Sequence, residues 1–212
     1  MIYAYQEIYL NKTQSLLGDA FDYAINIFEL PSSDFVSMFL VSSYSKRIEK
    51  GDLSIIQGRS GIELVIDVCH EITNKYLDVE PEFRNERSAE YWVGWAIAYY
   101  QWYSNRTFDE IFKVFSFEDL KTMYYPLHEA DIGKFLDIAD KRIRDFFHDT
   151  NLKRIRKSAG LNQAELARIA NVNIRSIQMY EQRNIDINKA SFETVYRLSK
   201  ALGCSLERLY EN

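Results

Sequence analysis

Glycine, proline and cysteine are scarce in this chain of 212 residues, which has 8, 3 and 2 of them. With no low-complexity run either, this scarcity argues against long disordered linkers and against collagen-like or mucin-like segments. No internal repeat of about 20 to 50 residues is present, which argues against repeat architectures. We therefore expect a compact chain, and its length suits two modest domains, each with its own core.

Signals for export, membrane insertion, metal binding and cofactor binding are also lacking. Residues 1–10 have neither the basic region nor the apolar run of a signal peptide, and the longest apolar stretch, near residues 92–103, is too short to span a bilayer. Cys69 and Cys204 have no ligand-like spacing around them, and no GxxxxGK[ST], GxGxxG or HExxH pattern occurs. We expect a cytoplasmic protein with no membrane partner, no metal and no cofactor.

Residues able to act as acids or bases do not cluster in the sequence. The groups considered are His70, His128, His148, Glu63, Glu90 and Asp131. The histidines are scattered, and each carboxylate has an ordinary explanation on the surface of a helix. We therefore predict that the chain is not an enzyme.

Charge is distributed unevenly, although the net charge of the whole chain is only −5. Residues 151–212 contain 11 Lys and Arg against 6 Asp and Glu, whereas residues 1–150 contain 15 against 25. A basic C-terminal segment on an acidic body has the electrostatic character of a nucleic-acid-binding domain on a larger protein.

Apolar residues recur with helical spacing through most of the first 150 residues, and the fold class is predicted to be all-α. The expected helices cover residues 16–28, 33–50, from 60 to before Pro81, 88–104, 107–115, 116–126 and 128–148. Capping boxes at Ser60 and Thr107 and a cap at Ser88 mark three helix starts, and Thr13 is predicted to cap the first helix. Weak strand patterns occur at residues 2–9 and 53–56.

Aromatic residues are concentrated between residues 91 and 103. The cluster consists of Tyr91, Trp92, Trp95, Tyr99, Tyr100, Trp102 and Tyr103. Such side chains could line a ligand pocket, since they combine apolar walls with polar handles. We favour a role in the core or in an interface, because aromatic anchors also dominate protein interfaces.

Two short helices with a sharp turn between them are predicted after Gly160. Asn162 and Glu165 have capping-box spacing, and Asn171 tolerates the left-handed conformation that a sharp turn requires. Ala167 is small where the two helices would cross. Leu166, Val172, Ile177 and Tyr180 form the apolar set that would face inward. This arrangement is typical of a helix-turn-helix.

Residues 151–212 closely resemble the Xre/Cro-type repressor family, the lambdoid-repressor-like helix-turn-helix regulators. The resemblance rests on the segment from Leu161 to Gln182, on the preceding LKRIRKSAG and on the following FETVYRLSKALGCSLERLYE. It implies a five-helix DNA-binding domain over residues 150–212, which would follow the helical domain that the apolar spacing predicts over residues 1–149. It also implies that the chain regulates transcription, as a repressor, by binding double-stranded operator DNA.

The resemblance assigns roles to two groups of residues. Bases in the major groove would be read by Asn173, Ile174, Arg175, Gln178 and Met179. Backbone phosphates would be contacted by Asn162, Gln163, Gln182, Lys153 and Lys157. Arg175 is the expected specificity determinant, because arginine can donate two hydrogen bonds to guanine. A purely structural alternative remains, in which this segment is a packing module and the basic run from Lys153 to Lys157 is only a solvated face.

Residues 91–103 and 127–132 resemble Xre-type regulators that are antitoxin components of toxin-antitoxin modules. This resemblance implies that residues 1–149 bind a cognate toxin while the C-terminal domain represses the shared promoter. The alternative is a phage-type or small-molecule-responsive repressor whose N-terminal domain senses a ligand or dimerises. Family members bind two half-sites as dimers, and we expect a homodimer here.

Overall fold

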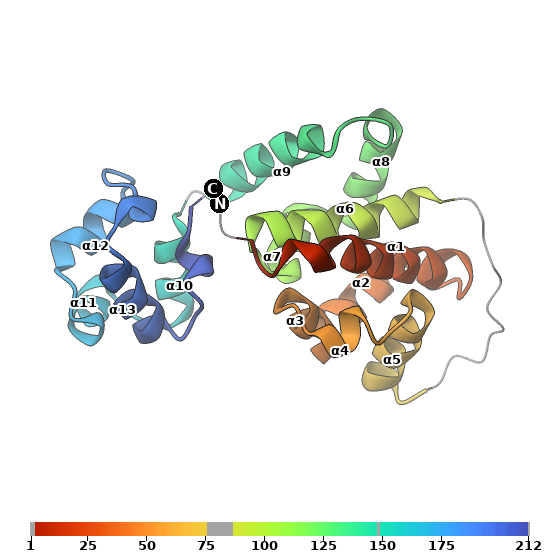
Figure 1. The fold of residues 1–212 in the computed structure, drawn as a ribbon, viewed down its shortest axis with the longest axis horizontal. Coiled ribbons are helices and arrows are strands. Elements are labelled where there is room, and N and C mark those ends of the chain that lie inside the picture. The colour runs from red at the N-terminus through yellow and green to blue at the C-terminus, as the bar shows by residue number, and fades with distance from the viewer. Residues whose placement is uncertain (1–2, 76–86, 148, 212) are drawn as a thin grey trace. The chain divides into compact units, whose positions relative to one another are not determined.

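A computed structural model describes residues 3–75, 87–147 and 149–211, and all regular structure in these ranges is helical (Figure 1). The described residues form two compact units, residues 3–143 and residues 144–211. We call them the N-terminal and the C-terminal unit. The proposed domain boundary at Asp149 and Thr150 lies in the non-helical connection between α9 and α10.

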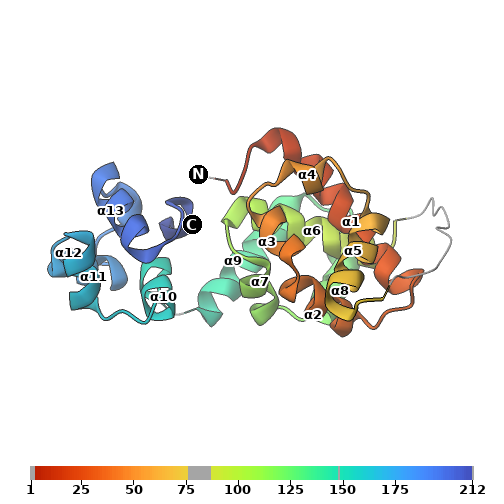
Figure 2. The same cartoon turned by 90° about the horizontal axis from the view of Figure 1, so that it is seen from below.

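The N-terminal unit contains the following elements in chain order. They are η1 (Glu7–Tyr9), α1 (Leu10–Asn26), α2 (Ser32–Val41), α3 (Ser43–Glu49), α4 (Leu53–Ile56), α5 (Gly61–Thr73), α6 (Ala89–Ser104), α7 (Phe108–Val114), α8 (Phe117–Leu127) and most of α9 (Ile132–Phe146). Helix α1 lies along α6 and also packs on α5, as both views show (Figures 1 and 2). Helices α2 and α8 complete the core around Phe21, Phe35 and Phe39, which are fully buried.

The C-terminal unit contains α10 (Asn151–Ser158), α11 (Gln163–Ala170), α12 (Ile174–Glu181), η2 (Ile187–Lys189), α13 (Phe192–Leu202) and η3 (Glu207–Leu209). Helix α11 packs on α12 and α13, while α10 contacts α12 and η3. The last of the five expected helices is the 3-10 turn η3.

Helix caps account for several of the helix starts in the N-terminal unit. Capping boxes are present at Ser60 and Thr107, and the Ser88 side chain accepts a hydrogen bond from Tyr91, as predicted. Thr13 is not a cap. It lies inside α1, where its hydroxyl donates to the Tyr9 carbonyl at 3.0 Å, because the helix begins at Leu10, ahead of the apolar pattern.

The single helix expected over residues 33–50 is two helices. Ser42 adopts an extended conformation between α2 and α3, and its hydroxyl donates to the Phe39 carbonyl at 2.7 Å. The Glu71 carboxylate on α5 accepts hydrogen bonds from the amide and hydroxyl of Ser43. The Glu71 side chain therefore provides a hydrogen-bond acceptor for an amide in the first turn of α3. A prediction from local spacing does not detect this contact, because Glu71 lies on another helix.

The weak strand patterns do not form strands. Within residues 3–9 the regular structure is η1, and residues 53–56 form α4. Asp52 caps α4 by accepting a hydrogen bond from the Ser54 amide, and Ile55 and Ile56 are buried. The long helix expected over residues 128–148 is α9, whose helical residues begin at Ile132. His148 and Pro81 lie outside the described residues.

No helix in the described ranges combines the length and the apolar character required to cross a membrane.

Candidate nucleic-acid interface

Three asparagines define the ends of α11 and the start of α12. Asn162 caps α11 in a reciprocal capping box with Glu165. Asn171 ends α11 in the left-handed conformation, at φ 49° and ψ 48°. Asn173 then caps α12, because its side-chain oxygen accepts a hydrogen bond from the Arg175 amide at 2.8 Å. The capping box and the left-handed turn confirm two of the sequence-based predictions.

One apolar cluster holds these helices together. Its buried members are Leu152, Ile155, Leu166, Ala170, Ile177, Ile187, Leu198 and Leu209, and Ala167, Val172 and Tyr180 are among the partly buried residues packed against it. The inward set predicted from the sequence is therefore confirmed. Because α12 is anchored along its inner side through Ile177, its orientation is fixed by packing rather than by solvent-exposed contacts.

A buried polar network lies at the C-terminal end of α12. The Arg156 guanidinium on α10 donates two hydrogen bonds to the Glu181 carboxylate, at 2.6 and 2.8 Å, and a third to the Leu161 carbonyl at 2.7 Å. Gln163 Nε2 on α11 donates to the same carboxylate at 2.8 Å. The side chains of Arg156 and Glu181 are 9% and 1% exposed, so the pair is shielded from solvent. The hydrogen bonds to Glu181 raise the pKa of Arg156.

This network was not predicted from the sequence. Arg156 belongs to the basic run from Lys153 to Lys157, but it is neither a phosphate contact nor part of a solvated face, because its guanidinium is buried against Glu181. A signal was present: Arg156 lies four residues after the buried Leu152, and therefore on the same face of α10. Gln163 is half-buried, and its hydrogen bond to Glu181 links the start of α11 to the end of α12.

The proposed base-reading residues lie at the beginning and along the outer side of α12. Asn173, Ile174 and Arg175 are exposed, and Gln178 and Met179 are half-buried. The Asn173 side-chain oxygen is already used for the cap, which leaves its amide nitrogen as a donor. Within the part of the chain that the structure describes, the Arg175 side chain makes no ion pair or hydrogen bond.

The proposed phosphate-contacting residues fall into two groups. Asn162 and Gln163 lie at the start of α11, and Gln182 follows the end of α12, where its side-chain oxygen accepts a hydrogen bond from Asn184 at 3.0 Å. Lys153 and Lys157 lie on α10, and both ammonium groups pair with the Asp149 carboxylate, at 2.5 and 2.7 Å. Hydrogen bonds from these two lysines lower the pKa of the Asp149 carboxyl group.

The acid and base candidates of the N-terminal unit are engaged in local contacts. Glu63 closes the capping box of α5, and Glu90 pairs with Lys121 at 2.7 Å. Asp131 accepts a hydrogen bond from the Gly133 amide. His128 binds carbonyls of its own helix turn. Among the described residues, no group of three His, Cys, Asp or Glu side chains is arranged to hold a metal ion.

Comparison with known proteins gives a match in the same part of the chain. A family model described as helix-turn-helix matches residues 152–209. No curated protein and no solved structure matches the chain. The matched range extends from α10 to η3 and contains the turn, the apolar cluster and the buried network described above. Residues 152–209 are therefore a helix-turn-helix domain of the Xre and lambda-repressor type, the DNA-binding domain of a transcription regulator.

Proposed function

We propose that this protein represses transcription by binding a specific operator, with α12 as the recognition helix in the major groove. The observation that carries the proposal is the asymmetry of α12. Its inner side is fixed by Ile177 and by the buried Glu181 network, while Arg175 at its first turn is exposed and unpaired within the described residues. A rigidly held helix that presents a free guanidinium suits the direct reading of base edges.

Arg175 is the proposed specificity determinant. Its guanidinium can donate two parallel hydrogen bonds to O6 and N7 of a guanine, a pattern that no other base pair offers. Ile174, which is 40% exposed, and Met179 would contact thymine methyl groups, while Asn173 and Gln178 would supply further hydrogen bonds. Asn162, Gln163, Gln182, Lys153 and Lys157 would fix the register of the domain on the phosphate backbone.

Anisotropy titrations on DNA from upstream of the protein's own gene test this proposal. We expect preference for that DNA over random duplex, and a log affinity that falls linearly with log salt as phosphates are neutralised. Arg175→Ala should cost about 1–3 kcal/mol of discrimination at one base pair. Arg168→Ala is the matched control, because Arg168 is also exposed but lies on α11, outside the proposed base-reading set. Equal loss of binding to all sequences in Arg175→Ala would contradict base reading.

We also propose that the protein binds its operator as a homodimer through the C-terminal unit. Phe192 and Tyr196 on α13 are 74% and 45% exposed, and their rings stack with centroids 5.9 Å apart. Phe192 also lines a hollow of about 260 Å³ whose apolar lining includes Ile187, Val195 and Leu206. A second copy of this surface would remove the stacked rings from water and place two recognition helices on successive half-sites.

The molar mass in solution tests the dimer. Phe192→Glu should convert the dimer to a monomer and weaken operator binding, because a carboxylate cannot be buried cheaply in an apolar interface. Ile169→Glu is the control, since Ile169 is 51% exposed on α11 and is not among the residues that line the hollow. If Phe192→Glu leaves the molar mass of a dimer unchanged, the interface lies elsewhere.

The N-terminal unit is proposed to control DNA binding, and two partners are considered. In the antitoxin form, supported by the resemblance of residues 91–103 and 127–132, it binds a toxin encoded beside it. Exposed apolar side chains such as Tyr125 and Val41, at 77% and 70%, are available as anchors. In the alternative form it senses a small molecule. Copurification with a neighbouring gene product that otherwise arrests growth favours the first, and metabolite-dependent operator binding favours the second.

A further inference from the structure

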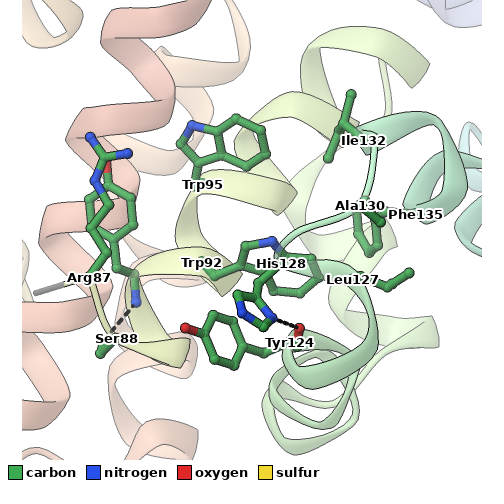
Figure 3. A pocket seen from close by; sticks show the side chains of 11 residues that line it. Arg87, Ser88, Trp92, Trp95, Tyr124, Leu127, His128, Ala130, Ile132 and Phe135 are labelled. Carbon is green, nitrogen blue, oxygen red and sulfur yellow. Dashed lines mark hydrogen bonds between the residues drawn. The ribbon is translucent and has the colours of Figure 1, made fainter.

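The N-terminal unit contains a cavity of about 290 Å³ between α6, α8 and the start of α9 (Figure 3). Aromatic side chains form much of its wall, among them Trp92 and Trp95 on α6 and Tyr124 on α8. Figure 3 shows Arg87 and Ser88 at one side of this space and Ala130, Ile132 and Phe135 at the other. Its volume lies just below the range of roughly 300–1,000 Å³ for drug-sized ligands, which suits a molecule of one or two rings.

The aromatic walls are held rigidly by their neighbours. Trp92 is only 9% exposed and meets the rings of Phe135 and Tyr124 edge-on, with centroids 5.6 and 6.2 Å apart. Helix α6 is itself locked on α1, because a Cβ at Gly94 would lie 2.2 Å from the Leu17 carbonyl oxygen. The cavity is therefore preformed, and flat apolar surfaces of this kind accept an aromatic ring.

The polar groups of the lining define the rest of the ligand. Among the described lining residues, Arg87 is the only Lys, Arg, Asp or Glu, and its guanidinium lies over the Tyr91 ring, 4.8 Å from the centroid. Within the described residues Arg87 forms no ion pair. Its charge partly offsets the rise that burial causes in the pKa of Asp19. Ser88 is already engaged, because its hydroxyl donates to Asp22 and accepts from the Tyr91 amide.

His128 supplies a second polar position. Its Nδ1 lies 3.0 Å from the Tyr124 carbonyl oxygen, and since a carbonyl only accepts, Nδ1 is the donor. In the neutral ring Nε2 is then an acceptor, able to receive an N–H or O–H from a ligand. The Glu129 carboxylate, whose side chain is 89% exposed, lies 3.7 Å from this nitrogen. The imidazole stacks on the Tyr124 ring with centroids 4.4 Å apart, which fixes its orientation.

We propose that this cavity binds a small aromatic carboxylate, with the ring between the tryptophans and the carboxylate on Arg87. Among the described residues, the lining combines an aromatic wall with one guanidinium that forms no ion pair, and it has no acidic side chain, which favours an anion over a cation. Guanidinium groups bind carboxylates through two parallel hydrogen bonds. A ring N–H or O–H is the complementary group for His128 Nε2.

Calorimetric titration of the full chain tests the proposal with three probes. Indole-3-acetate carries both the ring and the carboxylate, indole-3-acetamide lacks the charge, and hexanoate lacks the ring. We expect saturable binding of indole-3-acetate at one site per chain, and affinity at least about tenfold lower for the amide, because a charge-assisted hydrogen bond is lost. Equal affinity for all three probes, or no binding of the aromatic acid at millimolar concentration, would overturn the proposal.

Two variants and one control locate the site. Arg87→Gln should reduce the affinity for indole-3-acetate to that for the amide and leave the affinity for the amide unchanged. Ala130→Phe should abolish binding of both by filling the cavity. Arg144→Gln, at an exposed arginine outside the lining, should bind like the parent chain. Thermal unfolding of each variant establishes that it is folded, and undiminished binding by a folded Ala130→Phe chain would refute the site.

A separate titration connects the cavity to DNA and rests on the proposed function. Operator affinity, measured with and without saturating indole-3-acetate, should differ in the parent chain and not in Ala130→Phe. If calorimetry shows binding while operator affinity is unchanged, the cavity site stands and the sensor form of the proposed function fails. If no operator preference exists at all, the DNA proposal fails independently of the cavity.

Discussion

Replacing Gly94 with alanine tests the crossing of α1 and α6 directly. A Cβ built at Gly94 would lie 2.2 Å from the carbonyl oxygen and 2.6 Å from the carbonyl carbon of Leu17, and 2.9 Å from the amide nitrogen of Gly18. All three atoms belong to the backbone of α1, so no side chain can rotate out of the way. To reach an ordinary contact, the two helices must separate by about 1 Å.

The size of the effect follows from two opposing contributions. Overpacking a tight core costs about 1–3 kcal/mol, and the upper end applies here because both helices would have to move. Alanine regains about 1 kcal/mol over glycine in the interior of a helix. We therefore expect Gly94→Ala to lower the free energy of unfolding of the N-terminal unit by about 2 kcal/mol.

Urea unfolding followed by tryptophan fluorescence measures this change. All three tryptophans of the chain, Trp92, Trp95 and Trp102, lie on α6, so the signal reports on this packing. With a typical urea dependence, the midpoint should fall by about 1 M. Gly133→Ala is the control, because the added Cβ would meet only the carboxylate of Asp131, which can rotate. An unchanged or higher midpoint in Gly94→Ala would refute the reasoning.

Three further predictions concern the buried pair, the buried tyrosines and the phosphate contacts. Arg156→Met should destabilise the C-terminal unit by about 3–5 kcal/mol, because it leaves the Glu181 carboxylate buried without its cation. Adding Glu181→Leu should recover most of that loss, as measured by amide hydrogen exchange, and equal stability of the single and double variants would contradict this account. Burial raises the pKa of Tyr5 to about 12, and burial with the Asp140 carboxylate raises that of Tyr100. Both hydroxyls stay neutral in the folded chain while those of the unfolded chain ionise near pH 10, so the stability of the N-terminal unit should be constant below about pH 10 and fall between about pH 10 and 12. Tyr5→Phe should weaken that fall in urea titrations at pH 9 and 11, and an identical fall in the variant would exclude Tyr5 as its source. Finally, Lys157→Ala should lower operator affinity uniformly and reduce the salt dependence by about one phosphate contact, whereas a change confined to one base pair would argue against a phosphate contact.

The sequence was most informative where local chemistry decides the structure. Local chemistry made the caps at Asn162 and Ser60 predictable, because a capping side-chain oxygen accepts a hydrogen bond from an amide within three residues. The left-handed turn at Asn171 was predictable because asparagine adopts this backbone conformation readily. Helical periodicity likewise predicted the all-α fold and the inward residues Leu166 and Ile177.

The errors and omissions arise where distant residues meet. The break between α2 and α3 depends on Glu71, which lies 28 residues away from Ser43 in the chain. The pairing of Arg156 with Glu181 joins positions 25 residues apart. The cavity in the N-terminal unit is also formed by side chains from separate helices. The aromatic residues are visible in the sequence, but the sequence does not show which of them line the same cavity.

The shared carboxylate of Glu181 also has an evolutionary consequence. Because Arg156 and Gln163 both donate to it, a change of Glu181 leaves the Arg156 guanidinium and the Gln163 amide without this partner, and a change of Arg156 leaves the buried carboxylate without its cation. Neutral drift at these sites is therefore blocked one residue at a time and open only through coordinated replacements. Among homologues of this domain, the residues at positions 156, 163 and 181 should therefore vary together, whereas the exposed residues of α12 can change one at a time.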